Sequence, residues 1–451
     1  MAYEKTKAPY NEKSKIPENL NWETLINKDG DELESHYRHI LENLAKEDGM
    51  LGLIFRKSQN KISDPSKLKR VISEIGKINW NILGVDVKWE IYESLLSKVG
   101  EDTKSGAGQY FTPRSIIKVM VEVLNPSVKD KIYDPCCGTW GFLLAAHDFI
   151  LEKWWLDKDE QKELKTWVVF GKELVAGTAR LAVMNMFLHG IWEDKSPIEV
   201  GDSLIKAPDN KYTIVLTNPP FGKKSSDNFT TTEWGNSKSD NSIVRDDFWT
   251  TTSNKQLNFI QHIFSLLETN GTAGVVLPDN VLFEWGAGEV IRKKLLHNTN
   301  LHTIVRLPTG IFYANGVKAN ILFFQKKKAS EEAQTKEVWF YDLRTNNHFS
   351  LKQNILDIHH LEEFKNCYNI WNIYNRKETF NPEANPEWRW RKFSYDEIIK
   401  RDKTNLDIFW IKDKALEESE NLPSPKIIAA EIMADLENAL DMFSEIEWDL
   451  K

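Results

Sequence analysis

The sequence predicts an α/β protein with a helical N-terminal domain, a Rossmann-like central domain and a helical C-terminal tail. Residues 22–96 carry apolar side chains at helical spacing and few alternating patterns typical of strands. From residue 131 onward, short β-type runs alternate with helical stretches. This alternation is typical of a mostly parallel sheet covered by helices on both faces.

The length of 451 residues favours two or three domains. Glycines 100, 106 and 108 separate the N-terminal helical region from the rest. We therefore expect a helical domain at residues 1–100, a catalytic domain at 101–345 and an extension with a partner-binding helix at 346–451. After Pro425, apolar residues recur at threes and fours and indicate a helix with one apolar seam. Docking of that helix onto its own domain is an equally good reading.

Seven strands are expected in the central domain, at residues 131–134, 167–170, 198–200, 213–217, 273–277, 302–307 and 320–325. Helices are expected at 141–153, 178–189 and 257–267. Ligands of such sheets bind beyond the carboxyl ends of the strands, so the residues after each strand are the candidates for a site. The polar stretch 222–255 is too long for an ordinary loop, which indicates a functional loop or disorder.

Composition and charge limit the classes of function. The three cysteines form neither a disulfide framework nor a paired metal-ligand spacing, so we expect no metal. No stretch approaches the roughly 18 apolar residues of a membrane helix, and we expect a cytoplasmic protein without a membrane partner. The net charge of -8 is unusual for a protein that grips nucleic acid alone. Either the substrate is not nucleic acid, or another subunit supplies much of the grip.

Asn218-Pro219-Pro220-Phe221 follows a predicted strand directly. Two prolines fix the backbone and remove two N–H donors, which leaves the Asn218 side-chain oxygen and the Pro219 carbonyl as acceptors for one exocyclic amino group. Acceptors on both hydrogens favour a more nucleophilic nitrogen, and Phe221 can stack on an extruded base. The pattern predicts methylation of adenine N6. Asn-Pro is also a common turn dipeptide, so a plain turn is the alternative.

A second motif, running from Asp134 through Gly138, Thr139 and Gly141, lies between the first predicted strand and a helix. A glycine turn at this place lets backbone amides approach a cofactor. Two acids follow at later strand ends, Glu173 and Asp202. Glu173 is placed to accept both ribose hydroxyls of a nucleoside cofactor, and Asp202 can reach its adenine amino group. The alternative is that each is a surface acid capping a helix.

In these motifs and their order, the chain resembles the modification subunits of type I restriction-modification systems, which are adenine-N6 DNA methyltransferases. The resemblance rests on residues 108–114, the Asp134 motif, residues 179–190 and the Asn218 motif, and it extends to residues 402–410. It implies a seven-stranded S-adenosylmethionine-dependent methyltransferase domain. It also implies double-stranded DNA with a flipped adenine as substrate, a separate specificity subunit that reads the DNA, a second copy of the chain and a restriction subunit.

The resemblance implies roles for individual residues. Gln109, Tyr110, Phe111 and Thr112 would lie near the methionine end of the cofactor. Asp134, Gly138, Thr139 and Gly141 would line its pocket, and Glu173 and Asp202 would hold its nucleoside. Asn218, Pro219, Pro220 and Phe221 would hold the target adenine. His189, at the end of an apolar helix, is expected to be a capping or core residue without a catalytic role.

Five tryptophans stand where the resemblance leads us to expect glycine: Trp89, Trp140, Trp192, Trp285 and Trp388. Trp140 is the clearest case, because its neighbours match a Gly-Thr-Gly-Gly-Phe turn. An indole there should obstruct the cofactor and would be strained at positive φ. Two explanations remain open: drift in a defective gene, or a gene that reads UGA as glycine but was translated with UGA as tryptophan.

Two other functions compete with DNA methylation. Asn-Pro-Pro-aromatic motifs also serve planar amides, so the substrate could be a protein glutamine or RNA. Alternatively, the chain is a catalytically silent assembly subunit whose cofactor pocket is closed by Trp140.

Overall fold

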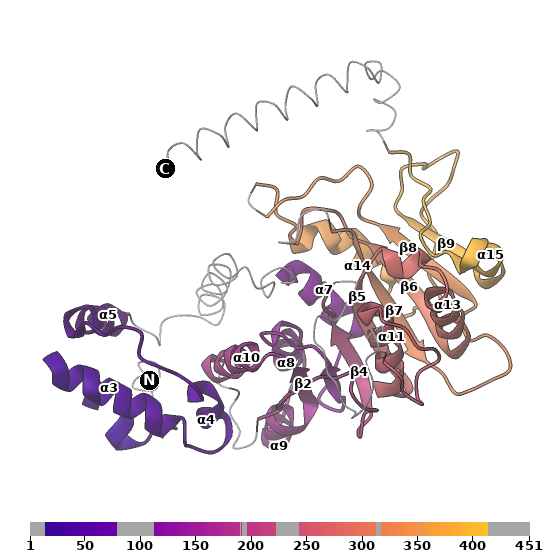
Figure 1. Cartoon of the computed structure of the whole chain (residues 1–451). Coiled ribbons are helices and arrows are strands. Elements are labelled where there is room, and N and C mark those ends of the chain that lie inside the picture. Colours follow the sequence, from indigo (N-terminus) through magenta and orange to yellow (C-terminus); the bar gives the residue numbers. More distant parts are fainter. Residues whose placement is uncertain are drawn as a thin grey trace, which may run out of the picture.

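The computed structural model describes residues 14–78, 112–189, 191, 196–221, 243–312, 317–351 and 353–413. Its central element is one nine-stranded sheet with the order β3-β2-β1-β4-β5-β7-β6-β8-β9 (Figure 1). The pairs from β3 to β5 are all parallel, whereas β7 runs antiparallel to both β5 and β6. The fold is therefore the mixed α/β arrangement that the sequence predicts.

All seven predicted strands are present. They are β1 (Ile132–Asp134), β2 (Val169–Glu173), β3 (Ile198–Val200), β4 (Tyr212–Thr217), β5 (Leu267–Pro278), β6 (Thr299–Arg306) and β7 (Ala319–Lys326). The second strand begins two residues later than predicted, because a π-helical turn, η4 (Leu164–Val168), takes up the start of that run. The fifth strand begins earlier than predicted, within the polar run that follows α11.

Two further strands, β8 (Glu337–Asp342) and β9 (Trp390–Ser394), extend the sheet beyond β6. The first runs parallel to β6, and the second runs antiparallel to the first. Because β9 pairs with β8, part of the extension predicted to begin at residue 346 belongs to the central sheet.

Helices cover both faces of the sheet. One face carries α7 (Arg114–Leu124), α8 (Gly141–Lys153), α10 (Ala176–Leu188) and α14 (Glu362–Tyr368), and the other carries α11 (Lys255–Leu266), α13 (Ala287–Asn298) and α15 (Tyr395–Lys400). Strand β4 illustrates how the two faces are built. Ile214 and Leu216 pack into the core of the first face and Val215 into that of the second, as the alternation of side chains along a strand requires.

Four further short elements belong to the region after residue 112. They are α9 (Lys158–Glu163), α12 (Asn280–Phe283), η5 (Ile358–Leu361) and η6 (Asp402–Thr404). None of the described helices is long and apolar enough to cross a membrane. The helix predicted after Pro425 lies outside the described residues.

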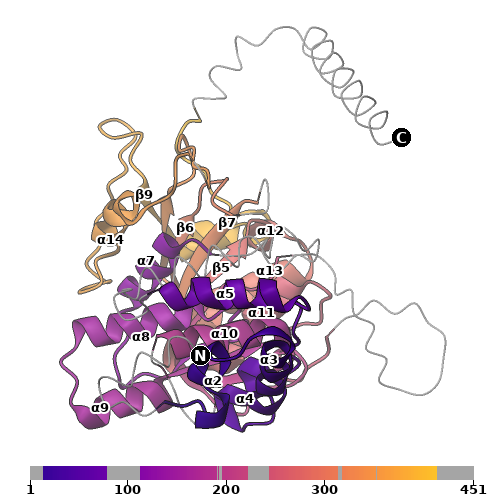
Figure 2. The ribbon, with the colours of Figure 1, turned by 90° about the vertical axis from the view of Figure 1, so that its left-hand side faces the viewer.

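The N-terminal region is helical, as predicted. It contains η2 (Glu18–Leu20), α2 (Trp22–Ile26), α3 (Gly30–Leu44), α4 (Gly49–Phe55) and α5 (Pro65–Lys77), which share their own apolar core. Figures 1 and 2 place these helices beside α10, away from β8 and β9. Met50 and Ile54 of α4 join the core of the sheet, and Arg180 of α10 donates to the Arg56 carbonyl at 3.3 Å.

A buried ion pair joins β6 to the first of the additional strands. Arg306 Nη1 donates to Asp342 Oδ2 at 2.7 Å, and the two side chains are 1% and 0% exposed. Burial lowers the pKa of Arg306, and the neighbouring Asp342 carboxylate opposes that shift. Each charge thus has an opposite charge as its nearest partner in the interior, and Asp407 lies 3.7 Å from Arg306 Nη2 as a second, more distant acid.

Replacing Asp342 by alanine should destabilise the fold, because it leaves the buried Arg306 charge with only the more distant Asp407 carboxylate. We expect the free energy of unfolding to fall by about 3–5 kcal/mol. The exposed pair between Lys293 and Glu289 is the control, and Glu289→Ala should leave the stability nearly unchanged. Urea unfolding of the three proteins measures the difference; equal effects of both substitutions would contradict the assignment.

Candidate active site

The predicted site residues lie at one edge of the sheet. Asp134 ends β1, Glu173 ends β2, Asp202 follows β3 by two residues and Asn218 follows β4 directly. These four strands are parallel neighbours, so their carboxyl ends meet at the same edge. The fold thus brings together residues that are far apart in the sequence.

The glycine turn after β1 is held by the neighbouring strand and helix. Cys137 N–H donates to the Lys172 carbonyl at 3.0 Å, and Gly138 N–H donates to Glu173 Oε2 at 3.0 Å. On the helix side, Asn185 Nδ2 donates to the Thr139 carbonyl at 3.1 Å. Gly138 has a φ of +52°, and a Cβ added there would meet nothing within 4 Å. The turn therefore presents its backbone to open space.

Asp134 connects this turn with the strand that carries the Asn218 motif. Its Oδ1 accepts hydrogen bonds from Thr217 Oγ1 at 2.6 Å and from Cys136 N–H at 3.0 Å. Because the carboxyl is only 2% exposed, burial raises the pKa of Asp134 to about 7, although these two hydrogen bonds lower it. Asp134 thus fixes the end of β1 against the end of β4. Because Thr217 immediately precedes Asn218, the same hydrogen bond also positions the start of the Asn218 motif.

The two acids at the next strand ends have different surroundings. Both oxygens of Glu173 already accept backbone N–H groups, Oε2 from Gly138 and Oε1 from Val175 at 2.8 Å. Burial raises the pKa of Glu173. Asp202 is partly exposed and accepts the Leu204 N–H at 2.8 Å, and the adjacent Ser203 hydroxyl donates to the Pro135 carbonyl at 2.5 Å. Ser203 thereby holds the loop after β3 against the glycine turn.

The segment 218–221 is predicted to hold the target adenine, and we therefore call it the adenine loop. It is held from three sides. Asn218 Nδ2 donates to Thr112 Oγ1 at 2.8 Å. The Pro220 carbonyl accepts Gln256 Nε2 at 3.2 Å. The Phe221 ring packs edge-on against Phe312, with 5.8 Å between the ring centroids. These contacts come from the residue two positions before α7, from α11 and from the segment after β6.

Several outcomes follow for the predicted residues. Thr112 lies beside Asn218, whereas Gln109, Tyr110 and Phe111 lie outside the described residues. Gly141 begins α8, where a Cβ would come within 3.2 Å of Ile117, so close helix packing explains this glycine. His189 caps the end of α10 with Nδ1 at 2.8 Å from the Asn185 carbonyl, as predicted.

Sequence reasoning missed three residues of the site: Thr217, Asn185 and Gln256. Each is a polar side chain that is 1% exposed or less. A buried polar group needs a hydrogen-bond partner, so a polar residue within an apolar run was the available signal. The identity of the partner, however, depends on the tertiary fold.

Trp140 occupies the position that needs glycine by its backbone. Its φ of 80° and ψ of 16° lie in the left-handed region, which costs a residue with a side chain about 1–2 kcal/mol. The indole is 0% exposed and belongs to the core of the first face. Its Nε1 has no hydrogen-bond partner among the described residues. Strain and an unpaired donor therefore coincide at this turn.

The other tryptophans of the set differ from Trp140. Trp285 and Trp388 are 70% and 50% exposed, and neither has a positive φ. Lys403 Nζ lies 3.1 Å from the centre of the Trp285 ring, and the Trp388 carbonyl accepts Trp410 Nε1. Trp89 and Trp192 lie outside the described residues. Among the described positions of the set, only 140 requires glycine by its conformation.

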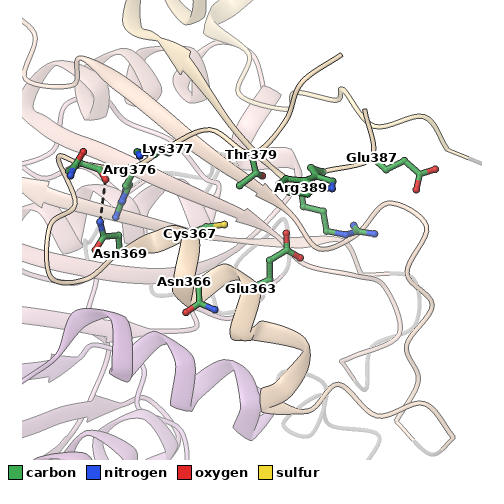
Figure 3. Close-up of a pocket in the computed structure, with 11 residues that line it drawn as sticks. Glu363, Asn366, Cys367, Asn369, Arg376, Lys377, Thr379, Glu387 and Arg389 are labelled. Atoms are coloured by element: carbon green, nitrogen blue, oxygen red, sulfur yellow. Dashed lines mark hydrogen bonds between the residues drawn. The ribbon is translucent and has the colours of Figure 1, made fainter. Parts of the chain in front are cut away.

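An open cavity of about 820 Å³ lies elsewhere in the molecule (Figure 3). Residues of α14 line one side, among them Glu363 and Cys367, and residues 375–389 line the other. None of the predicted site residues lines it. The predicted motifs thus converge at the carboxyl edge of the sheet and not at this cavity.

Comparison with known proteins gives a match to one family. The chain matches the family described as N-6 DNA Methylase over residues 84–418. It is 38% identical over 464 residues to the type I restriction enzyme EcoKI methylase subunit of Escherichia coli (strain K12), covering 94% of this chain and 85% of that protein.

Two solved structures are similar over almost the whole chain. The crystal structure of the EcoKI M protein (EC 2.1.1.72) has a TM-score of 0.58 at 34% identity and covers 100% of this chain and 89% of its own. A second structure, from work on the structural basis of complex assembly and conformational transition of the type I R-M system, has a TM-score of 0.71 at 26% identity. The match covers 99% of this chain and 90% of that chain.

The raised pKa of Asp134 predicts a pH dependence of stability. Between its ordinary value near 4 and about 7, the folded protein retains a proton that the unfolded chain releases. The contribution of this carboxyl to stability therefore falls as pH rises through that window, by an amount on the order of 4 kcal/mol. Asp134→Asn removes the titration, so the parent should lose stability relative to the variant across this range in urea unfolding. A stability difference that stays constant with pH would contradict the burial of this group.

Proposed function

Because this chain belongs to the N-6 DNA methylase family, we propose that the carboxyl edge of its sheet methylates N6 of adenine in DNA, with S-adenosylmethionine as the methyl donor. The single observation that carries the proposal is the link from Asp134 through Thr217 to Asn218. The glycine turn and the adenine loop follow adjacent strands, and this proximity supports transfer between a cofactor and a base.

The residues at the turn fit a nucleoside cofactor. Gly138 offers an open backbone cradle, and carboxylates stand at the ends of β2 and β3. Carboxylates accept hydrogen bonds from ribose hydroxyls and from an adenine amino group. We assign Glu173 to the ribose and Asp202 to the adenine of the cofactor, and Thr112 to the neighbourhood of its methionine end. When bound, S-adenosylmethionine supplies an electrophilic methyl group.

The adenine loop supplies acceptors for the target amino group. The Pro219 carbonyl accepts no hydrogen bond from the described part of the chain, and the Asn218 amide is oriented by its contact with Thr112. Both oxygens can accept from N6, which favours a nitrogen lone pair that points out of the base plane. Phe221 supplies an aromatic ring for stacking on a base turned out of the helix, and Phe312 packs against that ring at an angle of 74°.

The acidic balance of the chain explains the partners that we propose. A net charge of -8 does not provide the phosphate neutralisation on which DNA affinity depends. We therefore propose that a specificity subunit supplies the sequence reading and much of the grip, together with a second copy of this chain. The similarity to a solved structure that concerns complex assembly of the type I R-M system supports the proposal of partner subunits.

Asn218→Ala should separate cofactor binding from chemistry. The substitution removes an acceptor from the target amino group but none from the cofactor, so binding of S-adenosylmethionine should be nearly unchanged. The methylation rate should fall by at least about 10²-fold, the usual cost of removing one preorganised polar group. Tritium transfer from labelled S-adenosylmethionine to DNA, with the specificity subunit present, measures the rate. Normal transfer by this variant would refute the role of the loop.

A catalytically silent assembly subunit is the second candidate function, and the fully buried Trp140 is the observation that favours it. Trp140→Gly should strengthen binding of S-adenosylmethionine, because glycine removes both the strain of a left-handed backbone at a φ of 80° and the bulk of the indole packed beneath the turn. Overpacking of about 1–3 kcal/mol corresponds to a gain of roughly 10- to 100-fold in affinity.

Trp140→Ala is the matched control. It removes the indole but keeps a Cβ at positive φ, so its affinity should lie between those of the other two proteins. Calorimetric titration of all three under identical conditions provides the measurement. Equal affinities would mean that this turn does not hold the cofactor.

A further inference from the structure

We infer that Gln256 is a positioning residue for adenine methylation. Its buried amide holds the Pro220 carbonyl and thereby sets the direction of the two acceptors that precede Pro220, the Asn218 side-chain oxygen and the Pro219 carbonyl. The inference rests on the proposed function of the adenine loop. Gln256 acts through Pro220, so it is a positioning residue and not a catalytic one. The hydrogen bond from Gln256 Nε2 to the Pro220 carbonyl is 3.2 Å long.

The adenine loop cannot hold itself. Two of its four residues are prolines, which have no N–H to donate to a neighbouring strand or helix. Its orientation must therefore come from donors that reach its carbonyl groups and from contacts of its side chains. Thr112 and Phe312 fix the two ends of the loop, at Asn218 and Phe221. Gln256 holds the backbone between them.

The structure keeps Gln256 in place through its own network. The residue is 1% exposed and lies in the first turn of α11. Asn254 Oδ1 caps that helix by accepting the Gln256 N–H at 2.9 Å, and Asn254 Nδ2 donates to Glu284 Oε2 at 2.6 Å. Glu284 also accepts Asn280 Nδ2 at 3.0 Å. The adenine loop is thus joined through the start of α11 to the segment that follows β5.

The two proline carbonyls therefore have different roles: that of Pro220 binds the protein, and that of Pro219 is left for the substrate. The Pro220 oxygen accepts from Gln256, while the Pro219 oxygen accepts no hydrogen bond from the described residues. The proline rings fix φ but not ψ, so loss of Gln256 lets the Pro220 carbonyl rotate. Because Phe221 is held against Phe312, the peptide that carries the Pro219 carbonyl must absorb part of this movement. The target amino group would then lose the fixed geometry that the reaction needs.

Gln256→Met tests the inference, because methionine keeps the length of the side chain and removes the donor. Gln261→Met is the matched control. Gln261 is also 1% exposed and on α11, but it bonds the Thr250 backbone at 3.1 and 2.9 Å and not the adenine loop. With the specificity subunit present, kcat should fall at least about 10-fold in Gln256→Met, with affinity for S-adenosylmethionine unchanged, and stay within about twofold in Gln261→Met. Both substitutions are made with Trp140 and with Trp140→Gly.

A second readout does not depend on methylation. With 4-fluorophenylalanine at position 221, the fluorine NMR signal reports the order of the ring. Gln256→Met should broaden or shift this signal, whereas Gln261→Met should not. An unchanged signal together with an unchanged kcat would overturn the inference. A changed signal in a protein that methylates no DNA in any form would leave the positioning intact and reject the proposed function instead.

Gln256→Glu adds a test that a merely structural role would not pass. A protonated carboxyl can donate to the Pro220 carbonyl, but a carboxylate cannot. The kcat of this variant, relative to the parent, should therefore rise as pH falls. A ratio that is independent of pH would contradict a donor role for residue 256.

Discussion

The hydrogen bond from Thr217 to Asp134 is the interaction on which the site depends. It joins residues 83 positions apart, at the carboxyl ends of adjacent parallel strands. Asp134 begins the glycine turn, and Thr217 immediately precedes the adenine loop. A displacement of one strand end would therefore move the proposed cofactor pocket relative to the target base. Burial of this carboxyl, which raises its pKa to about 7, is the energetic cost of that coupling.

Both halves of the site follow the same physical rule. Each consists of a short segment that carries few internal hydrogen bonds and is held by side chains from elements on either side. The glycine turn is held by Glu173 and Asn185, and the adenine loop by Thr112 and Gln256. Such segments leave backbone groups free for a ligand. The tryptophan at position 140 breaks this rule, because it adds a buried side chain where the backbone is left-handed.

The sequence was sufficient to predict what local patterns determine. The apolar runs before Asp134 and Asn218 are strands. In the turn that follows Asp134, both Gly138 and Trp140 have positive φ, as expected for positions where the pattern predicts glycine. β8 and β9 were not predicted, because their place is set by non-local pairing and by the buried pair of Arg306 and Asp342. The role of Gln256 could not be predicted either, since its partner lies 36 residues away.

A crystal structure of the protein with a non-reactive analogue of S-adenosylmethionine would test the central claim most directly, that the carboxyl edge between β2 and β4 is the methyl-transfer site. We predict density for the nucleoside beside Glu173 and Asp202, with the amino-acid end directed toward Thr112 and Asn218. Density in the cavity between α14 and residues 375–389, with the Gly138 turn empty, would contradict it.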